Sequence, residues 1–361
     1  MEKTEIEKYD KSDMFSLLSD YPKLLETAIK NAQNSKAVFK ENEPDEILIL
    51  GIGGSAMSGE LLSSYLKNIV RTDTQKVVCP KISLNRDWNI PQNITKKTWV
   101  FVCSYSGNTE ETLSAFNKIQ YRTENIIAVT SGGKLEEICI KNGFQVLKMP
   151  SGMMPRCAMF YSFFHLLFAV VRHKIIKNED LVEFEKSIKN LFSDSFTKIL
   201  NQFSNLENEN KIIELASQLQ NKIPLIYSTQ PRLEAVNFRW RGQIQENANQ
   251  MCFGNFVPEL NHNEINGWVF PSDLLNRFVI ISIKDKDDSS DLTGSLGDTV
   301  KLLREKNITV REVFATVNGG LLERFVELIC MADWTSFYLA IFNKVDPTPI
   351  PEIAKLKALK Q

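Results

Sequence analysis

Two short segments of this chain combine glycines with side-chain hydroxyls, and each directly follows a run of apolar residues. They are GIGGSAMSG at 51–59 and SYSGNTEET at 104–112. Glycine lets the backbone turn sharply and approach a ligand closely, and the first turn of a helix presents unpaired N–H groups that favour an anion. The pattern indicates binding of a phosphate group, for which the candidate residues are Gly53, Gly54, Ser55, Ser104, Ser106 and Thr109.

The segment 51–59 has alternative interpretations. A dinucleotide fingerprint would use Gly51, Gly53 and Ala56, but no acidic ribose partner is obvious about 20 residues further on, since Asp73 lies in a polar segment. A Walker loop requires Gly-Lys-Ser/Thr, which does not follow. A tight turn between a strand and a helix, with no ligand, is the remaining alternative.

The second segment could instead be a helix N-cap, because serine or threonine followed by glutamate is typical of a capping box. A cap needs only one hydroxyl, however, and explains neither the group of three nor the glycine. A third segment, TSGGKL at 130–135, also follows an apolar run. Ligands of open α/β sheets bind beyond the carboxyl ends of the strands, so three such segments at one edge favour a ligand site.

The apolar runs predict the strands that position these segments. They are EILILG (46–51), TWVFVCS (98–104), NIIAVTS (125–131), FQVLKMP (144–150), KIPLIYS (222–228), RFVIISI (277–283) and ITVREVF (308–314). Continuous runs rich in valine and isoleucine, separated by helical stretches, are typical of parallel strands with helices on both faces. The predicted fold class is α/β, with two doubly wound α/β sandwich domains and mainly parallel sheets.

The length of 361 residues suits two domains. We predict N-terminal helices at 1–44, a first domain at 45–190, and a second domain with C-terminal helices at 205–361. A long apolar helix is expected at 321–343. The charged stretch KDKDDSSDLTGS at 284–295 is predicted to be a surface excursion.

Charge and cysteine content exclude several classes of function. The net charge is -1, from 43 basic and 44 acidic residues, which does not indicate a nucleic-acid-binding surface. The six cysteines form no C-x-x-C pair and no zinc spacing with histidine, so we expect reduced thiols and no metal or other cofactor. The charged start predicts no signal peptide, and the apolar stretch at 160–171 is too short to span a bilayer. A cytoplasmic protein without a membrane partner is predicted.

The three segments GIGGSAMSGELL, CSYSGNTEET and TSGGKL resemble the sugar isomerase (SIS) domain, which binds phosphosugars. Four further segments are similar to one branch, the bifunctional phosphoglucose/phosphomannose isomerase family: MPRCAMFYSF, QIQENAN, NHNEINGW and KVDPTPIPEIAKLK. The resemblance extends over nearly the whole chain. It implies an aldose–ketose isomerase that interconverts glucose 6-phosphate, mannose 6-phosphate or both with fructose 6-phosphate through a cis-enediolate.

The resemblance also implies roles for individual residues. The six candidate phosphate-binding residues match those of the family. Glu246 resembles the catalytic base, and Arg156 resembles the arginine that stabilises the enediolate. His262 resembles the ring-opening histidine, which the family supplies from the neighbouring subunit, so a homodimer is expected. Lys357 resembles a lysine that assists at the ring oxygen, and Lys344 and Lys355 lie close to it in sequence.

The chemistry of isomerisation suits these residue types. One carboxylate can take a proton from a carbon and return it to the next, an arginine can face the oxyanion of the enediolate, and histidine titrates near neutral pH. Each residue also has an ordinary structural interpretation, such as a solvated glutamate or a helix-capping arginine. Among the other histidines, His165 lies in an apolar run and is expected to be a core residue, whereas His173 is expected at a helix end.

Two other functions share the phosphosugar chemistry. The first is a non-catalytic SIS module that senses a phosphosugar, but residues 1–44 are too short and not basic enough for the DNA-binding domain that such a regulator needs. The second is an aminosugar-phosphate isomerase of the amidotransferase type, which would normally carry a glutaminase domain. A zinc-dependent mannose-phosphate isomerase would need clustered histidines, whereas this chain has three scattered ones.

Overall fold

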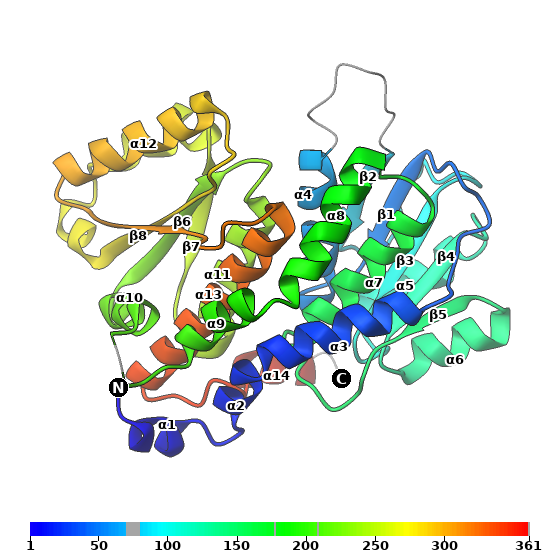
Figure 1. Cartoon of the computed structure of the whole chain (residues 1–361), viewed down its shortest axis with the longest axis horizontal. Coiled ribbons are helices and arrows are strands. Elements are labelled where there is room, and N and C mark those ends of the chain that lie inside the picture. Colours follow the sequence, from blue (N-terminus) through cyan, green and yellow to red (C-terminus); the bar gives the residue numbers. More distant parts are fainter. Residues whose placement is uncertain (70–79, 177, 208, 360–361) are drawn as a thin grey trace. The chain divides into compact units, whose positions relative to one another are not determined.

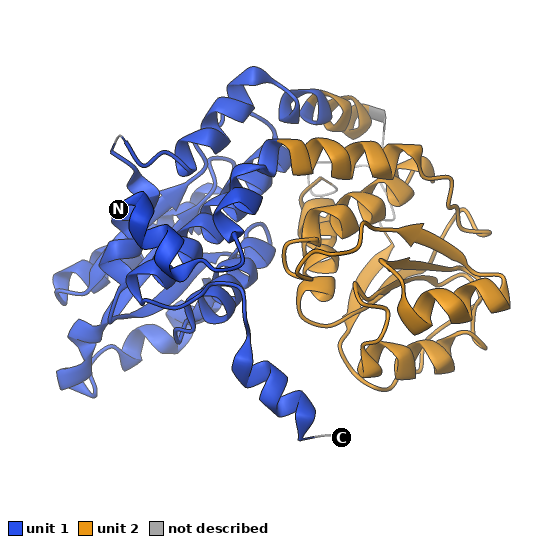
Figure 2. Ribbon diagram, turned by 90° about the horizontal axis from the view of Figure 1, so that it is seen from below, with its two compact units in different colours: residues 1–22, 187–361 blue, residues 23–186 orange. Residues whose placement is uncertain are grey.

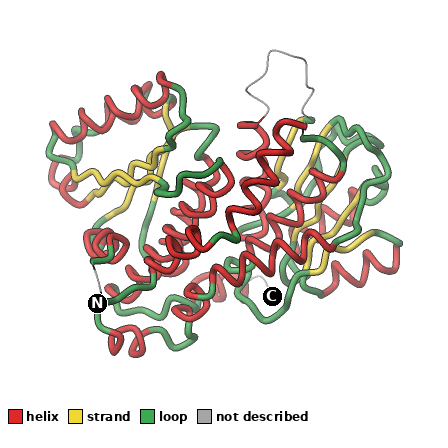
Figure 3. The backbone as a smooth tube through the Cα atoms, viewed as in Figure 1, coloured by secondary structure: helices red, strands yellow, loops and turns green. Residues whose placement is uncertain are grey.

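The structure, a computed structural model, describes residues 1–69, 80–176, 178–207 and 209–359. The chain forms two compact units, which Figure 2 shows in different colours. Unit 1 contains Met1–Pro22 and Ser187–Gln361, and unit 2 contains Lys23–Lys186. Each unit has a parallel sheet with helices on both faces (Figure 3), which confirms the predicted α/β fold with two doubly wound sandwiches.

Unit 2 is built on a five-stranded sheet in the order β2-β1-β3-β4-β5, with every pair parallel. Its strands are β1 (Glu46–Leu50), β2 (Lys81–Asn85), β3 (Trp99–Cys103), β4 (Ile126–Thr130) and β5 (Gln145–Lys148). All residues of β1, β3 and β4 are buried, as their continuous apolar runs predict. Strand β2 has no counterpart among the predicted strands, because this edge strand alternates polar with apolar residues.

Helices cover both faces of the unit 2 sheet. The helices α5 (Glu110–Ile119) and α6 (Gly133–Asn142) bury one face, in a cluster that includes Leu48, Val100 and Ala128. The helices α4 (Gly54–Ile69) and α7 (Met159–Arg172) lie on the other face. There α4 approaches β1 so closely that a side chain at Gly59 would come within 2.9 Å of Ile49 Cγ2.

Unit 1 contains a four-stranded parallel sheet in the order β7-β6-β8-β9. Its strands are β6 (Ile223–Thr229), β7 (Phe253–Val257), β8 (Phe278–Lys284) and β9 (Thr309–Phe314). Three of these strands match predicted runs. The edge strand β7 does not, because its sequence FGNFV contains glycine and asparagine and only its last residue is buried.

Figure 1 shows α12 on one side of the unit 1 sheet and α11 and α13 on the other. The bounds are α10 (Lys211–Leu219), α11 (Glu234–Ala248), α12 (Ser290–Glu305) and α13 (Leu321–Phe342). By length and composition α13 could cross a membrane, but 89% of its apolar window is buried inside the protein. It packs against α10 and α11, so the predicted long apolar helix is the central core helix of unit 1.

The remaining helices complete the two units. They are α1 (Lys3–Tyr9), α2 (Met14–Ser19), α3 (Tyr21–Asn34), α8 (Asn178–Leu191), α9 (Asp194–Phe203) and α14 (Pro351–Ala358), with short 3₁₀ helices η2 (Glu259–His262), η3 (Glu264–Gly267) and η4 (Ser272–Arg277). In unit 1, α2 packs on α13 through an edge-to-face contact of Phe15 with Trp334, whose ring centroids are 5.4 Å apart.

The prediction of a surface excursion at 284–295 is right only in part: most of these residues are exposed, but the loop is short and one of its aspartates is buried. Lys284 ends β8, and Ser290 begins α12 with its N-cap on Ser289. Asp285 is only 6% exposed, because its carboxylate accepts a hydrogen bond from Arg324 Nε at 2.7 Å. The many charges of this stretch are typical of a solvated loop, whereas the arginine that pairs with Asp285 lies 39 residues away in sequence.

Candidate active site

The loops after β1 and β3 lie at a topological switch point of the unit 2 sheet. The chain leaves β1 through α4 to reach β2 on one side, and leaves β3 through α5 to reach β4 on the other. The two helices start on opposite faces, so their loops diverge beyond the carboxyl ends of the strands. Such a crevice is where open α/β sheets bind ligands.

Hydrogen bonds connect the predicted loops within this crevice. The backbone N–H of Tyr105 donates to Ser55 Oγ at 3.2 Å, which joins the second loop to the first. The hydroxyls of Ser104 and Thr109 lie 3.0 Å apart, so a hydrogen bond joins the two ends of the second loop. Ser106 is exposed, and its hydroxyl accepts the N–H of Asn108.

The N-cap residue of α5, Thr109, makes no side-chain capping hydrogen bond. The capping-box interpretation of the second segment therefore does not account for this hydroxyl. Because the first N–H groups of a helix have no partner within it, uncapped groups beside several hydroxyls are suited to an anion.

Glycines of the second and third loops permit direct backbone contact. Gly107 has φ +67°, and a side chain there would come within 1.8 Å of Gly132 O. Gly133 has φ +74°, and its missing side chain would collide with Ser106 O at 2.3 Å. The N–H of Leu135 then donates to Gly107 O at 2.9 Å. These glycines let the third loop pack directly against the second loop, which is a structural role and not contact with a ligand.

Arg156 lies beside the first loop. Its side chain is buried, with 3% of the residue exposed. A side chain at Gly54 would meet Arg156 Cα at 3.2 Å and Pro155 O at 3.3 Å, which is tighter than ordinary packing. Gly54 thus allows the backbone that carries Arg156 to approach the first loop. Gly53 has φ +58°, and a side chain there would have no neighbour within 4 Å. The structure brings the phosphate-loop candidates and Arg156 together in unit 2.

Glu246 lies in the last turn of α11 in unit 1 and is half-buried. Its neighbours fix this turn: Gln245 Nε2 donates to Cys252 O at 2.7 Å, and Asn247 Nδ2 donates to Ser336 Oγ at 2.9 Å. Because α11 connects the parallel strands β6 and β7, it runs antiparallel to both. Its last turn therefore lies at the amino edge of the sheet.

His262 lies at the other end of β7. It ends η2, which follows the carboxyl end of the strand, and it is exposed. The preceding Asn261 is bonded to α12, through Ser295 Oγ at 2.9 Å and Thr299 Oγ1 at 2.7 Å. His262 is therefore on the α12 face of the sheet, whereas Glu246 belongs to α11 on the opposite face.

The distance between Glu246 and His262 within one chain is large. The five residues of β7 span about 17 Å at ~3.3 Å per residue. The thickness of the sheet adds to this distance, because the two residues lie on opposite faces. The two groups therefore lie far apart within unit 1.

The other candidate groups have clear positions. Lys357 is exposed on α14, Lys355 pairs with Glu352 at 2.6 Å, and Lys344 is exposed just after α13. Glu264, a possible alternative base, has its carboxylate occupied by Tyr227 and Asn255.

The remaining two histidines have structural positions, as expected. His165 is 2% exposed, and burial lowers its pKa from 6.5 to about 4. His173 is the C-cap residue of α7, and its Nε2 accepts the N–H of Phe39 at 2.9 Å. Among the described residues no group of three or more His, Cys, Asp or Glu side chains could hold a metal ion.

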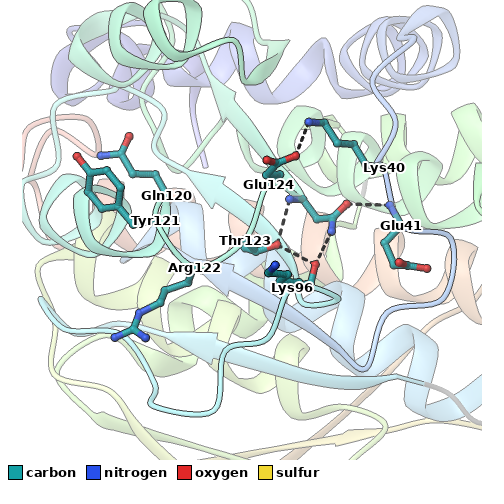
Figure 4. Close-up of a pocket in the computed structure, with 9 residues that line it drawn as sticks. Lys40, Glu41, Lys96, Gln120, Tyr121, Arg122, Thr123 and Glu124 are labelled. Carbon is teal, nitrogen blue, oxygen red and sulfur yellow. Dashed lines mark hydrogen bonds and ion pairs between the residues drawn. The ribbon is translucent and has the colours of Figure 1, made fainter.

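A pocket of about 500 Å³ in unit 2 lies away from these loops (Figure 4). It is lined by residues that precede β1, β3 and β4, among them Lys40, Lys96 and Glu124, so it lies at the amino edge of the sheet. Lys40 and Glu124 form an ion pair of 2.7 Å across it. The loops of the switch point lie at the opposite, carboxyl edge.

Comparisons with known proteins agree with this geometry. Residues 208–359 match the family described as Bacterial phospho-glucose isomerase C-terminal SIS domain. The C-terminal domain of glucosamine-fructose-6-phosphate aminotransferase from Francisella tularensis has the same fold, with a TM-score of 0.70 at 13% identity over 92% of this chain and 97% of that one.

Two relatives carry the name bifunctional phosphoglucose/phosphomannose isomerase. The protein of Aquifex aeolicus is 30% identical over 86% of this chain and 89% of its own length. The protein of Caldicellulosiruptor bescii is 36% identical over 95% of this chain and 98% of its own length. With this identity over almost the entire length of both proteins, the chain belongs to the bifunctional phosphoglucose/phosphomannose isomerase family.

Proposed function

We propose that this protein interconverts glucose 6-phosphate, mannose 6-phosphate or both with fructose 6-phosphate through a cis-enediolate. The observation that carries the proposal is the loop cluster at the β1/β3 switch point, where hydroxyls of two loops are joined and the backbone of the buried Arg156 packs against Gly54 of the first loop. Membership of the isomerase family supports the same reaction. The substrate phosphate would bind Ser55, Ser104, Ser106 and Thr109, with Gly53 and Gly54 lining the first loop.

The reaction assigns one task to each remaining group. Glu246 takes the proton from C2 of the aldose and returns it to C1, because one carboxylate can reach two adjacent carbons. Arg156 stabilises the oxyanion of the enediolate, where a fixed positive charge is most effective. His262 and Lys357 assist ring opening at the ring oxygen.

The positions of Glu246 and His262 support a homodimer as the active form. Within one chain they lie at opposite ends of β7 and on opposite faces of its sheet. This separation favours a base and a ring-opening acid that come from two copies of the chain. Because the proposed substrates are intermediates of carbohydrate metabolism, we also place the enzyme in the cytoplasm.

A coupled assay with glucose 6-phosphate and mannose 6-phosphate tests the proposal. Wild-type protein should turn over at least one of them to fructose 6-phosphate and remain active in EDTA. Glu246→Gln should lower kcat by about 10²–10⁴-fold, because the amide cannot accept a proton. The control Glu214→Gln, an exposed glutamate of α10, should not change the rate. Near-normal turnover by Glu246→Gln would refute the assignment of the base.

A further inference from the structure

Tyr105 has no assigned role in the reaction, but it makes hydrogen bonds to several loops around the switch point. It is 8% exposed and lies in the second loop. Its backbone N–H donates to Ser55 Oγ at 3.2 Å, in the first loop. Its backbone carbonyl accepts the N–H of Ser131 at 2.9 Å and the hydroxyl of the same residue at 2.6 Å, in the third loop.

The side chain of Tyr105 reaches a fourth segment. Its hydroxyl donates to Pro150 O at 3.0 Å and accepts the N–H of Met153 at 2.8 Å. Both partners belong to the irregular segment between β5 and α7, which also carries Arg156. The backbone of Tyr105 thus binds the phosphate-loop candidates, and its hydroxyl binds the segment of the arginine.

A second contact holds the same segment. Pro155 and Arg156 pack onto Gly54, at would-be side-chain distances of 3.3 and 3.2 Å. Met154 O then accepts the N–H of Cys157 at 2.9 Å, which forms the turn into α7. The backbone on the amino-terminal side of Arg156 is therefore held at two places, the Tyr105 hydroxyl and the first loop.

We propose that Tyr105 is the positioning residue that couples the phosphate-binding loops to Arg156. When the phosphate binds the second loop, the Tyr105 hydroxyl sets the segment 150–153 and, through it, the place of the guanidinium relative to the phosphate. This inference rests on the proposed function of the site. The arginine acts on an oxyanion that forms several bonds away from the phosphate, so its placement relative to the phosphate decides whether binding leads to turnover.

Tyr105→Phe separates the two halves of this arrangement. The substitution leaves the backbone bonds to Ser55 and Ser131 in place and removes only the two bonds of the hydroxyl. We expect kcat to fall by about 10–100-fold, because small misplacement of a catalytic group is costly. KM should change by less than about threefold, since the phosphate contacts remain. Tyr121→Phe, at a tyrosine that is 84% exposed, is the matched control and should behave as wild type.

Two measurements without turnover make the test independent of the proposed reaction. Hydrogen–deuterium exchange of a peptide covering 149–158 should be faster in Tyr105→Phe, whereas a peptide covering 104–112 should exchange as in wild type. Inorganic phosphate should bind with an unchanged dissociation constant. A sugar-acid hydroxamate phosphate, which carries the oxyanion of the enediolate, should bind about tenfold more weakly.

The outcomes are distinguishable. Unchanged kcat in Tyr105→Phe, with an active wild type, would overturn the positioning role and leave the proposed function intact. A higher KM or weaker phosphate binding at unchanged kcat would also overturn it, because Tyr105 would then serve the phosphate itself. An inactive wild-type protein would instead refute the proposed function, and faster exchange at 149–158 would still support the coupling.

Discussion

The two units contain the same kind of switch point, but with opposite chemistry. In unit 2 it lies between β1 and β3, and in unit 1 it lies between β6 and β8, from which α11 and α12 leave for opposite faces. At the first, the loops contain glycines and hydroxyls with an uncapped helix start. At the second, a network of carboxylates and arginines fills the corresponding place.

The arginines and carboxylates of this network in unit 1 pair with one another. Arg324 binds Asp285 at 2.7 Å and Asp287 at 2.6 Å, and Arg232 lies 3.4 Å from Asp288. Thr229, the last residue of β6, donates to the same Asp288 at 3.0 Å. Carboxylates here would repel a phosphate, and the arginines that could attract one are already paired. The strand order therefore creates a crevice in both units, but the residues at its edge decide whether an anion can bind.

The largest expected effect is on the stability of unit 1. Arg324→Leu should lower the free energy of unfolding by about 3–5 kcal/mol, because it leaves the buried Asp285 carboxylate with only the longer, 3.8 Å ion pair to Arg232. The measurement is hydrogen–deuterium exchange of β8 and α13 in the full chain, with urea unfolding of the same variant. Arg304→Leu, which breaks a half-exposed pair with Glu312, is the matched control and should cost less than about 1 kcal/mol. Recovery of stability in Asp285→Leu/Arg324→Leu would support the pairing, and a loss in the double variant equal to the sum of the two single losses would contradict it.

A smaller effect is expected in unit 2 on acidification. His165 is buried neutral, with its pKa lowered from 6.5 to about 4 by burial, so the unfolded chain binds a proton before the folded chain does. Its contribution to stability is present in full above pH 6.5 and is lost as the pH falls towards 4, by up to about 3 kcal/mol. The difference in unfolding free energy between wild type and His165→Gln, measured from pH 7 to pH 4, should change in this window. A difference independent of pH would show that His165 titrates normally in the folded chain.

The smallest effect compares one threonine at each of the two switch points. Thr109→Val removes a proposed phosphate donor, and we expect about a tenfold weaker binding of the sugar phosphate, which is about 1.4 kcal/mol. Thr229→Val removes a hydroxyl at the unit 1 switch point, where its partner is Asp288, and binding should not change. Calorimetric titration with glucose 6-phosphate measures both. Equal losses of affinity in the two variants would contradict the distinction between the two crevices.

The central strands were predictable from the sequence because burial on both faces requires continuous apolar runs, as in β1, β3 and β4. The edge strands β2 and β7 were not, since an edge strand is partly exposed and its sequence alternates or contains glycine. The prediction at 284–295 missed the buried Asp285 for a related reason. A buried aspartate such as Asp285 looks like a surface residue until its partner is known, and Arg324 comes from a distant helix.

For the site, residue types and spacing by themselves determined the three glycine- and hydroxyl-rich segments at strand ends, because a tight turn beside a helix start needs those residues wherever it occurs. The tertiary structure alone decided how the segments are joined. Gly54 accommodates the backbone of Arg156, 102 residues further along the chain, and Tyr105 binds three other segments, including that of Ser55, 50 residues before it. It also placed Glu246 and His262 at opposite ends of β7, since their separation depends on the direction of α11 and the length of the strand. Local sequence specifies the conformation of each loop, and the packing of strands and helices specifies which loops meet.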